Sequence, residues 1–171
     1  MATPRLKTIF YLFATSVLLI ACKQNNTSTM QDRIAIQDLI SNYAYCADNR
    51  EAQKQAELFS PDAIVNVYMG KDDKPAQTLR GREALQRGFE TLKQYEATMH
   101  FNGQNTITTL TDDTATGIAY CIAHHVKADS TKRTLMIMAI RYHDKYVKQN
   151  GHWYFAQRDL LIDWTDTREM H

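Results

Sequence analysis

The sequence predicts an α+β domain whose N-terminal helices cover one face of a curved antiparallel sheet. Apolar residues recur at 3.6-residue spacing in three segments of the first half, which is the period of an amphipathic helix. From Thr98 onward the period changes to two, as in half-buried strands. Helices followed by an antiparallel meander pack as two layers. We therefore expect a cone-shaped barrel in which three helices pack on the concave face of a strongly curved sheet, with an apolar pocket between them.

Three helices and one strand are predicted in the first half. The first helix spans residues 31–48, where apolar side chains recur on one face. The second spans 51–59 and ends before Ser60-Pro61, because proline disfavours helix in the residue that precedes it. The segment GKDDKPAQTLRG, residues 70–81, is a loop by composition. The other elements are a strand over 63–69 and a third helix over 82–93.

The second half is predicted to form four long strands. Turn-forming residues such as Gln149-Asn150-Gly151 separate them. The helices leave the convex face of this sheet uncovered, and alternate apolar residues over 118–126 and 136–140 would face outward there. Exposed apolar patches of that size usually meet a partner, so we expect a homodimer. The predicted strands span 99–110, 115–126, 134–147 and 153–164.

The first 22 residues have the features of an export signal. Arg5 and Lys7 precede an apolar run of about 13 residues, whereas a membrane-spanning helix needs about 20. Leu19-Ile20-Ala21-Cys22 resembles the bacterial lipobox. We therefore predict a lipoprotein signal peptide over 1–21, a lipid on Cys22, a flexible tether over 22–30 and a domain over 31–171. The alternative is an ordinary signal peptide with a coincidental cysteine.

This assignment predicts a protein of the bacterial cell envelope that touches a membrane surface only through its lipid anchor. Without Arg5 and Lys7 the chain keeps 18 basic against 19 acidic residues, a formal charge of −1. That balance does not favour binding of nucleic acid. Cys46 and Cys121 could pair in an exported protein, but each lies in an apolar run, which favours small buried thiols.

His100 lies within a predicted strand where an apolar residue would fit the pattern better. Side chains alternate along a strand, so His100 would share one face with Asn102, Gln104 and Thr106, a face too polar for a plain core. The other face would carry the apolar residues Met99, Phe101 and Ile107. His100 is therefore either a satisfied core histidine or a residue that meets water or a ligand.

Asp48 offers a partner for that histidine. It falls near the C-terminus of the first helix, where the macrodipole disfavours a carboxylate by roughly 0.3–1 kcal/mol. A carboxylate bonded to one ring nitrogen fixes the tautomer of a histidine and leaves the other nitrogen as a general base. The alternative is a solvated aspartate, because no spacing rule shows that Asp48 and His100 meet.

His124 and His125 are adjacent on a strand, so only one of them can face the pocket. Small residues on the odd-numbered face of that strand leave room for a ligand, which favours His125. A zinc site is the competing use of the histidines, but no HxH or HExxH spacing is present and we expect no metal. Neither a GxSxG motif nor a glycine-rich phosphate loop occurs, so hydrolase and nucleotide-binding functions lack support.

Four stretches between Gln31 and Trp164 resemble the SnoaL-like branch of the nuclear transport factor two-like superfamily, and especially the scytalone and bile acid dehydratases. The resemblance covers nearly the whole predicted domain. The stretches are IQDLISNYAYCADNREAQKQAELFSPDAIV, RGREAL, MHFNGQNTI and GHWYFAQRDLLIDW.

The resemblance implies roles for particular positions. The helix-end aspartate and strand histidine of the scytalone dehydratases fall on Asp48 and His100, and their second pocket histidine falls on His125. Their pocket asparagine falls on Tyr142, which is a departure. The bile acid dehydratases carry a participating tyrosine five residues before the aspartate, and Tyr43 has that spacing.

These observations predict a cofactor-independent lyase, dehydratase or isomerase. His100, held by Asp48, would remove a proton α to a carbonyl, while Tyr43 or Tyr142 donates to the carbonyl oxygen and His125 assists the leaving group. The substrate would be a small hydrophobic carbonyl compound, polyketide-, steroid- or sugar-like. The predicted substrate-binding residues are Tyr142 and Asn102. The alternative is a non-catalytic small-molecule-binding or assembly domain, since fold does not dictate function.

Overall fold

The structure is a computed structural model that describes residues 28–170. The predicted signal peptide, the lipid site at Cys22 and the tether up to residue 27 lie outside the described residues. Residues 28–30 are helical, so the helix begins earlier than the predicted Gln31. Their side chains are all exposed, and apolar periodicity cannot detect a turn that buries nothing. Residues up to Ile34 form a separate unit from the compact unit that starts at Ala35.

Helical backbone extends over residues 28–48 and then ends in a tight turn. Arg50 in that turn has a left-handed backbone, with φ of 56°. Three short helical segments follow: α2 (Ala52–Glu57), α3 (Gly81–Phe89) and the 3-10 helix η1 (Glu90–Gln94). The prediction for α2 was too long at its C-terminal end, because Phe59 already belongs to the first strand. No helix within residues 28–170 is long and apolar enough to cross a bilayer.

A six-stranded mixed sheet has the order β2-β1-β6-β5-β4-β3. β1 pairs in parallel with β6, and every other neighbouring pair is antiparallel. The strands are β1 (Phe59–Met69), β2 (Gln77–Arg80), β3 (Ala97–Leu110), β4 (Thr114–Ala128), β5 (Arg133–Gln149) and β6 (His152–Met170). The sheet is thus mostly, and not wholly, antiparallel.

β2 is an element that the sequence prediction assigned to a loop. Its four residues are exposed except for the half-buried Leu79, so they show no alternation. Pairing with β1 holds them in the sheet, with Leu79 opposite Val65. A short polar edge strand of this kind has little signal in the sequence.

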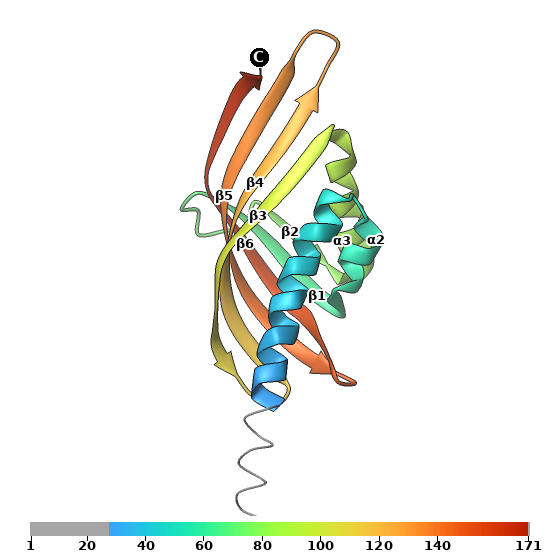
Figure 1. The fold of residues 1–171 in the computed structure, drawn as a ribbon, viewed down its shortest axis with the longest axis vertical. Coiled ribbons are helices and arrows are strands. Elements are labelled where there is room, and N and C mark those ends of the chain that lie inside the picture. Colours follow the sequence, from blue (N-terminus) through green and yellow to red (C-terminus); the bar gives the residue numbers. More distant parts are fainter. Residues whose placement is uncertain (1–27, 171) are drawn as a thin grey trace, which may run out of the picture. The chain divides into compact units, whose positions relative to one another are not determined.

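The core of the compact unit lies between the helices and one face of the sheet (Figure 1). Ile36 and Ile40 of the N-terminal helix are buried there together with Phe59 and Phe155 from the paired strands β1 and β6. This is the predicted α+β arrangement, with helices on the inner face of a bent sheet. Cys46 and Cys121 are buried free thiols, as predicted.

The pairing of β3 with β4 shifts register between Asn102 and Asn105 and again between Ile107 and Thr109. Such bulges reverse the side-chain alternation. The predicted shared face of His100, Gln104 and Thr106 is therefore wrong. Gln104 and Thr106 are exposed, and Ile107 packs against the core although it was expected on the opposite face.

Candidate active site

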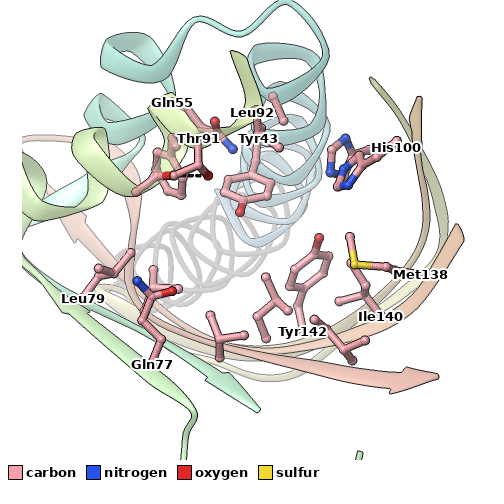
Figure 2. A pocket seen from close by; sticks show the side chains of 18 residues that line it. Tyr43, Gln55, Gln77, Leu79, Thr91, Leu92, His100, Met138, Ile140 and Tyr142 are labelled. Carbon is pink, nitrogen blue, oxygen red and sulfur yellow. Dashed lines mark hydrogen bonds between the residues drawn. The ribbon is translucent and has the colours of Figure 1, made fainter. Parts of the chain in front are cut away.

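A cavity of about 210 Å³ lies between the helices and the inner face of the sheet (Figure 2). It is smaller than the pockets of roughly 300–1,000 Å³ that hold drug-sized ligands. Apolar side chains such as Val65, Met138 and Ile140 form much of its wall. Four of the residues predicted for the site line it, namely Tyr43, His100, His125 and Tyr142. The cavity therefore brings together residues that are up to about a hundred positions apart.

Asp48 lies behind His100 and bonds to it in two ways. Oδ1 of Asp48 is 2.7 Å from Nδ1 of the His100 ring. The backbone N–H of His100 donates to both carboxylate oxygens, at 3.0 and 3.1 Å. Partial burial raises the pKa of Asp48, but these bonds to His100 and a bond from Thr98 outweigh it, so the net pKa lies below its ordinary value. Asp48 is therefore a carboxylate at neutral pH.

The His100 ring is well fixed between Asp48 and the cavity. Its side chain is 8% exposed, against 28% for the Asp48 side chain. With Nδ1 engaged by the carboxylate, Nε2 is the nitrogen able to take a proton from a ligand. The turn after the N-terminal helix helps to position Asp48 beside His100. In this turn the backbone N–H of Arg50 donates to the carbonyl of Ala47, one residue before Asp48.

His125 is buried and lines the cavity beside His100, with 5.5 Å between the ring centroids. Its other face stacks on Tyr95, at 4.6 Å. Both ring nitrogens are buried without a hydrogen-bond partner among the described residues. Burial, with a smaller effect from His100, lowers the pKa of His125 to about 4. His125 is thus a neutral imidazole with one unused donor and one unused acceptor, whereas His124 does not line the cavity.

Tyr43 and Tyr142 both line the cavity and pack edge to face, with ring centroids 5.9 Å apart. Figure 2 shows both hydroxyl groups pointing into the space between the helices and the sheet. Burial raises the pKa of Tyr43, although the Arg158 guanidinium opposes it, and burial raises the pKa of Tyr142 well above its usual value. Both are therefore neutral phenols that can donate a hydrogen bond.

Arg158 is a buried cation that the sequence prediction missed. Its guanidinium lies 4.2, 4.0 and 4.1 Å from the ring centroids of Tyr43, Tyr142 and Phe155. Two bonds of 2.8 Å join it to Asp144. The register of β5 contained a signal, because Tyr142, Asp144 and Tyr146 alternate and place a carboxylate on the apolar face of the sheet.

Asn102 was predicted to contact the substrate but does not line the cavity. It is half-buried beside the β3 bulge and is not part of the cavity wall. The pairing is regular from His100 to Asn102, so Asn102 keeps the face of His100, but it lies two residues farther along β3 than the part of that strand that lines the cavity. Within the described part of the chain, no group of three or more His, Cys, Asp or Glu side chains could hold a metal ion.

The family model of the SnoaL-like domain matches residues 28–159 of this sequence, which is most of the chain. The chain belongs to this family. The match includes every predicted site residue of this SnoaL-like domain, from Tyr43 in the N-terminal helix to Tyr142 in β5. A comparison with curated protein sequences gives no match.

Solved structures share the fold of this SnoaL-like domain. A putative scytalone dehydratase from Novosphingobium aromaticivorans is 22% identical, with 85% of this chain and 93% of that one covered and a TM-score of 0.73. The dehydrochlorinase LinA-type3 from Novosphingobium barchaimii is 18% identical, with 84% and 94% covered and a TM-score of 0.70. The beta subunit of a putative aromatic-ring-hydroxylating dioxygenase from Novosphingobium aromaticivorans is 20% identical, with 79% and 91% covered and a TM-score of 0.66. These likenesses establish the nuclear transport factor two-like cone fold.

Proposed function

We propose that this SnoaL-like domain is a cofactor-independent lyase or isomerase that removes a proton α to a carbonyl of a small hydrophobic compound. The observation that carries the proposal is the bond between Asp48 and Nδ1 of His100 at the wall of an apolar cavity. A core histidine would need neither a carboxylate on one side nor a cavity on the other. General base catalysis by a positioned side chain typically contributes about 10²–10⁴-fold.

In the proposed reaction, Nε2 of His100 takes the proton from the α carbon. The electron pair of the broken C–H bond moves toward the carbonyl oxygen, where Tyr43 or Tyr142 donates a hydrogen bond to the growing negative charge. Asp48 stabilises the imidazolium that forms. In an elimination, the enolate re-forms the carbonyl as a group on the β carbon departs, and the N–H of neutral His125 can donate to that group. In an isomerisation, His100 returns the proton elsewhere.

Exchange of α protons for deuterium tests the proposal without knowledge of the natural substrate. A panel of cyclic ketones, including 1-indanone, is incubated in D2O with the protein, and deuterium at the α carbon is followed by NMR. We expect wild-type protein to accelerate exchange above buffer, and His100→Ala to lose that acceleration. His143→Ala, an exposed histidine on β5, is the matched control. If no ketone of the panel exchanges faster than in buffer, or if His100→Ala exchanges as fast as wild type, the base is not His100.

The rival function is a non-catalytic binding or assembly domain. One of the similar structures supports an assembly function, because it is named as the beta subunit of a putative dioxygenase. Retained binding of a ketone by the cavity without any α exchange would favour that function. Fold similarity does not separate the two, since one fold can serve both.

We also propose that the domain is a homodimer formed through the outer face of the sheet. One row across four strands of that face contains Phe101, Ile122, Ala139 and Trp164. Phe101 is 68% and Trp164 53% exposed, which is unusual for large apolar side chains. Sedimentation velocity at micromolar concentration should give a dimer. A monomer at that concentration would contradict the proposal.

We further propose a lipid on Cys22 and a place at the cell envelope, held to a membrane surface by that lipid alone. The proposal is supported by the Leu19-Ile20-Ala21-Cys22 sequence after the apolar run. Mass spectrometry of protein extracted from bacterial membranes should find an acylated N-terminal cysteine. A soluble chain that lacks acyl groups would rule it out.

A further inference from the structure

Gln55 is a buried amide on the inner side of α2. It is 1% exposed, and its neighbours on that side of the helix are the small residues Ala52 and Ala56. Its Oε1 is buried without a hydrogen-bond partner among the described residues. An amide buried without a partner costs free energy that an apolar side chain at the same place would avoid. Gln55 therefore has a hydrogen-bonding capacity that the described protein groups do not use.

This amide belongs to the wall of the same cavity as His100. Gln55 and Thr91 both line this cavity, and in Figure 2 they appear on one side of the Tyr43 ring and His100 on the other. The Thr91 hydroxyl donates to the carbonyl of Gly88 at 2.7 Å, so its lone pairs are left as acceptors. Gln77 from β2 adds a second amide to the cavity wall. The cavity thus has two polar regions, one around the histidines and one around Gln55.

Apolar side chains separate the two polar regions. Leu79, Leu92 and Ile140 all line the cavity, and Figure 2 shows Leu79 on the side of Gln77 and Ile140 on the side of Tyr142. A ligand that fills such a cavity needs a largely apolar body, with one polar group toward the histidines and tyrosines and another toward Gln55. The small volume limits that ligand to a compact molecule of roughly one or two rings.

We propose that Gln55 recognises a hydroxyl group of the substrate that is distant from the reacting carbonyl, so that the substrate class is compact cyclic hydroxy-ketones. The choice of the histidine end for the carbonyl rests on the proposed function. A hydroxyl suits an amide best because it can donate to the oxygen and accept from the nitrogen, whichever way the amide is turned. An ether oxygen can only accept, and a hydrogen atom leaves Gln55 unpaired.

A matched pair of ligands tests the inference. Binding of 1-indanone and 5-hydroxy-1-indanone is measured by isothermal titration calorimetry at neutral pH, with 5-methoxy-1-indanone as a third compound. We expect wild-type protein to bind the hydroxy compound at least about five-fold more tightly than the other two, the gain of one buried hydrogen bond. This comparison needs no variant protein.

Two variants locate the effect. Gln55→Leu keeps a branched side chain, one heavy atom shorter, and removes its polar atoms, so the preference for the hydroxy compound should disappear while 1-indanone binds as well as before or better. Gln53→Leu changes an exposed glutamine on the same helix and should keep the wild-type preference. Circular dichroism melts show that each variant is folded.

The outcomes separate this inference from the proposed function. Selective binding through Gln55 without α exchange of any ketone of the panel would contradict the proposed function and keep the hydroxyl site. Exchange of 1-indanone without any preference for the hydroxy compound would do the opposite. Failure of wild-type protein to prefer 5-hydroxy-1-indanone, including the case in which neither compound binds, overturns the inference. So does an unchanged preference in Gln55→Leu.

Discussion

Two acidic side chains in this protein each hold a nitrogen-rich partner, and they do so in opposite ways. Asp144 and Arg158 have side chains that are 0% exposed, and two bonds of 2.8 Å join them. The Tyr146 hydroxyl adds a third bond to Asp144, at 2.9 Å. Asp48 and His100 share one ring bond, and the Asp48 side chain keeps 28% of its surface exposed.

The contrast between the two pairs lies in how deeply each is buried, and burial decides what each pair can do. Arg158 is a permanent cation that sits against three aromatic rings, so neither it nor Asp144 can change charge without cost to the fold. The Asp48 carboxylate bonds to Nδ1 of His100 and is placed to stabilise the ring when it carries a proton. The pair of Asp144 and Arg158 is suited to holding Tyr43 and Tyr142 in place. The pair of Asp48 and His100 is suited to the proton transfer that we propose.

The largest expected effect comes from breaking the buried pair. Arg158→Leu leaves the Asp144 carboxylate buried without its cation and should lower the free energy of unfolding by about 3–5 kcal/mol. The double variant Arg158→Leu/Asp144→Leu removes both charges and should recover a large part of that loss. Urea denaturation measures both. A single variant within about 1 kcal/mol of wild type would show that the two pairs do not differ in this way.

A smaller effect is expected on the pH dependence of stability, through the buried His125. The pKa of His125 is about 4 in the folded protein, against about 6.5 in an unfolded chain. Between these values the unfolded chain binds a proton that the folded protein does not, so stability is complete above about pH 6.5 and falls by about 2–3 kcal/mol as the pH drops to 4. His125→Gln should lose this part of the slope. His143→Gln, an exposed control, should keep it.

The smallest expected effect concerns the partly buried pair of Asp48 and His100. The pKa of Asp48 is lower in the folded protein than in the unfolded chain, so its contribution is present above about pH 4 and is lost as the pH falls below that. Asp48→Asn should therefore cost about 1–2 kcal/mol at pH 7, where charged hydrogen bonds contribute most, and little at pH 3. Asp38→Asn on the exposed side of the same helix is the control. Equal costs at both pH values would contradict the charge assignment.

The candidate site was predicted mainly from residues that do not fit the pattern of the helix or strand in which they lie. His100 was found because a histidine in a strand and an aspartate at a helix C-terminus each break a rule, and His125 because its strand is regular throughout. The same reasoning failed at Gln104, Thr106 and Ile107, because the bulge at this point is a backbone irregularity that no residue in this stretch signals. β2 was missed because its one half-buried residue, Leu79, cannot produce the alternation of apolar and polar residues that marks a strand.

Arg158 and Gln55 were within reach of the sequence but were passed over. Gln55 lies between Ala52 and Ala56 on the apolar side of a predicted helix, and a polar residue there is the same kind of conflict as His100. Arg158 was hidden by the register shift between β5 and β6 near Tyr146, which changes the face that each β6 residue takes. Local periodicity fixes a face only until the first irregularity.

The parallel pairing of β1 with β6 has a consequence for how the protein is made. β1 spans Phe59–Met69, and its partners in β6 lie at Phe155–Ile162, so this contact joins residues about 95 positions apart. Contacts of such long sequence separation slow folding. During synthesis the cavity walls from the helices, β3 and β4 emerge first, and Arg158, which supports both tyrosines, emerges late. A nascent chain stalled before β6 already contains both cavity histidines but lacks Leu160 and Ile162, the β6 residues of the cavity wall.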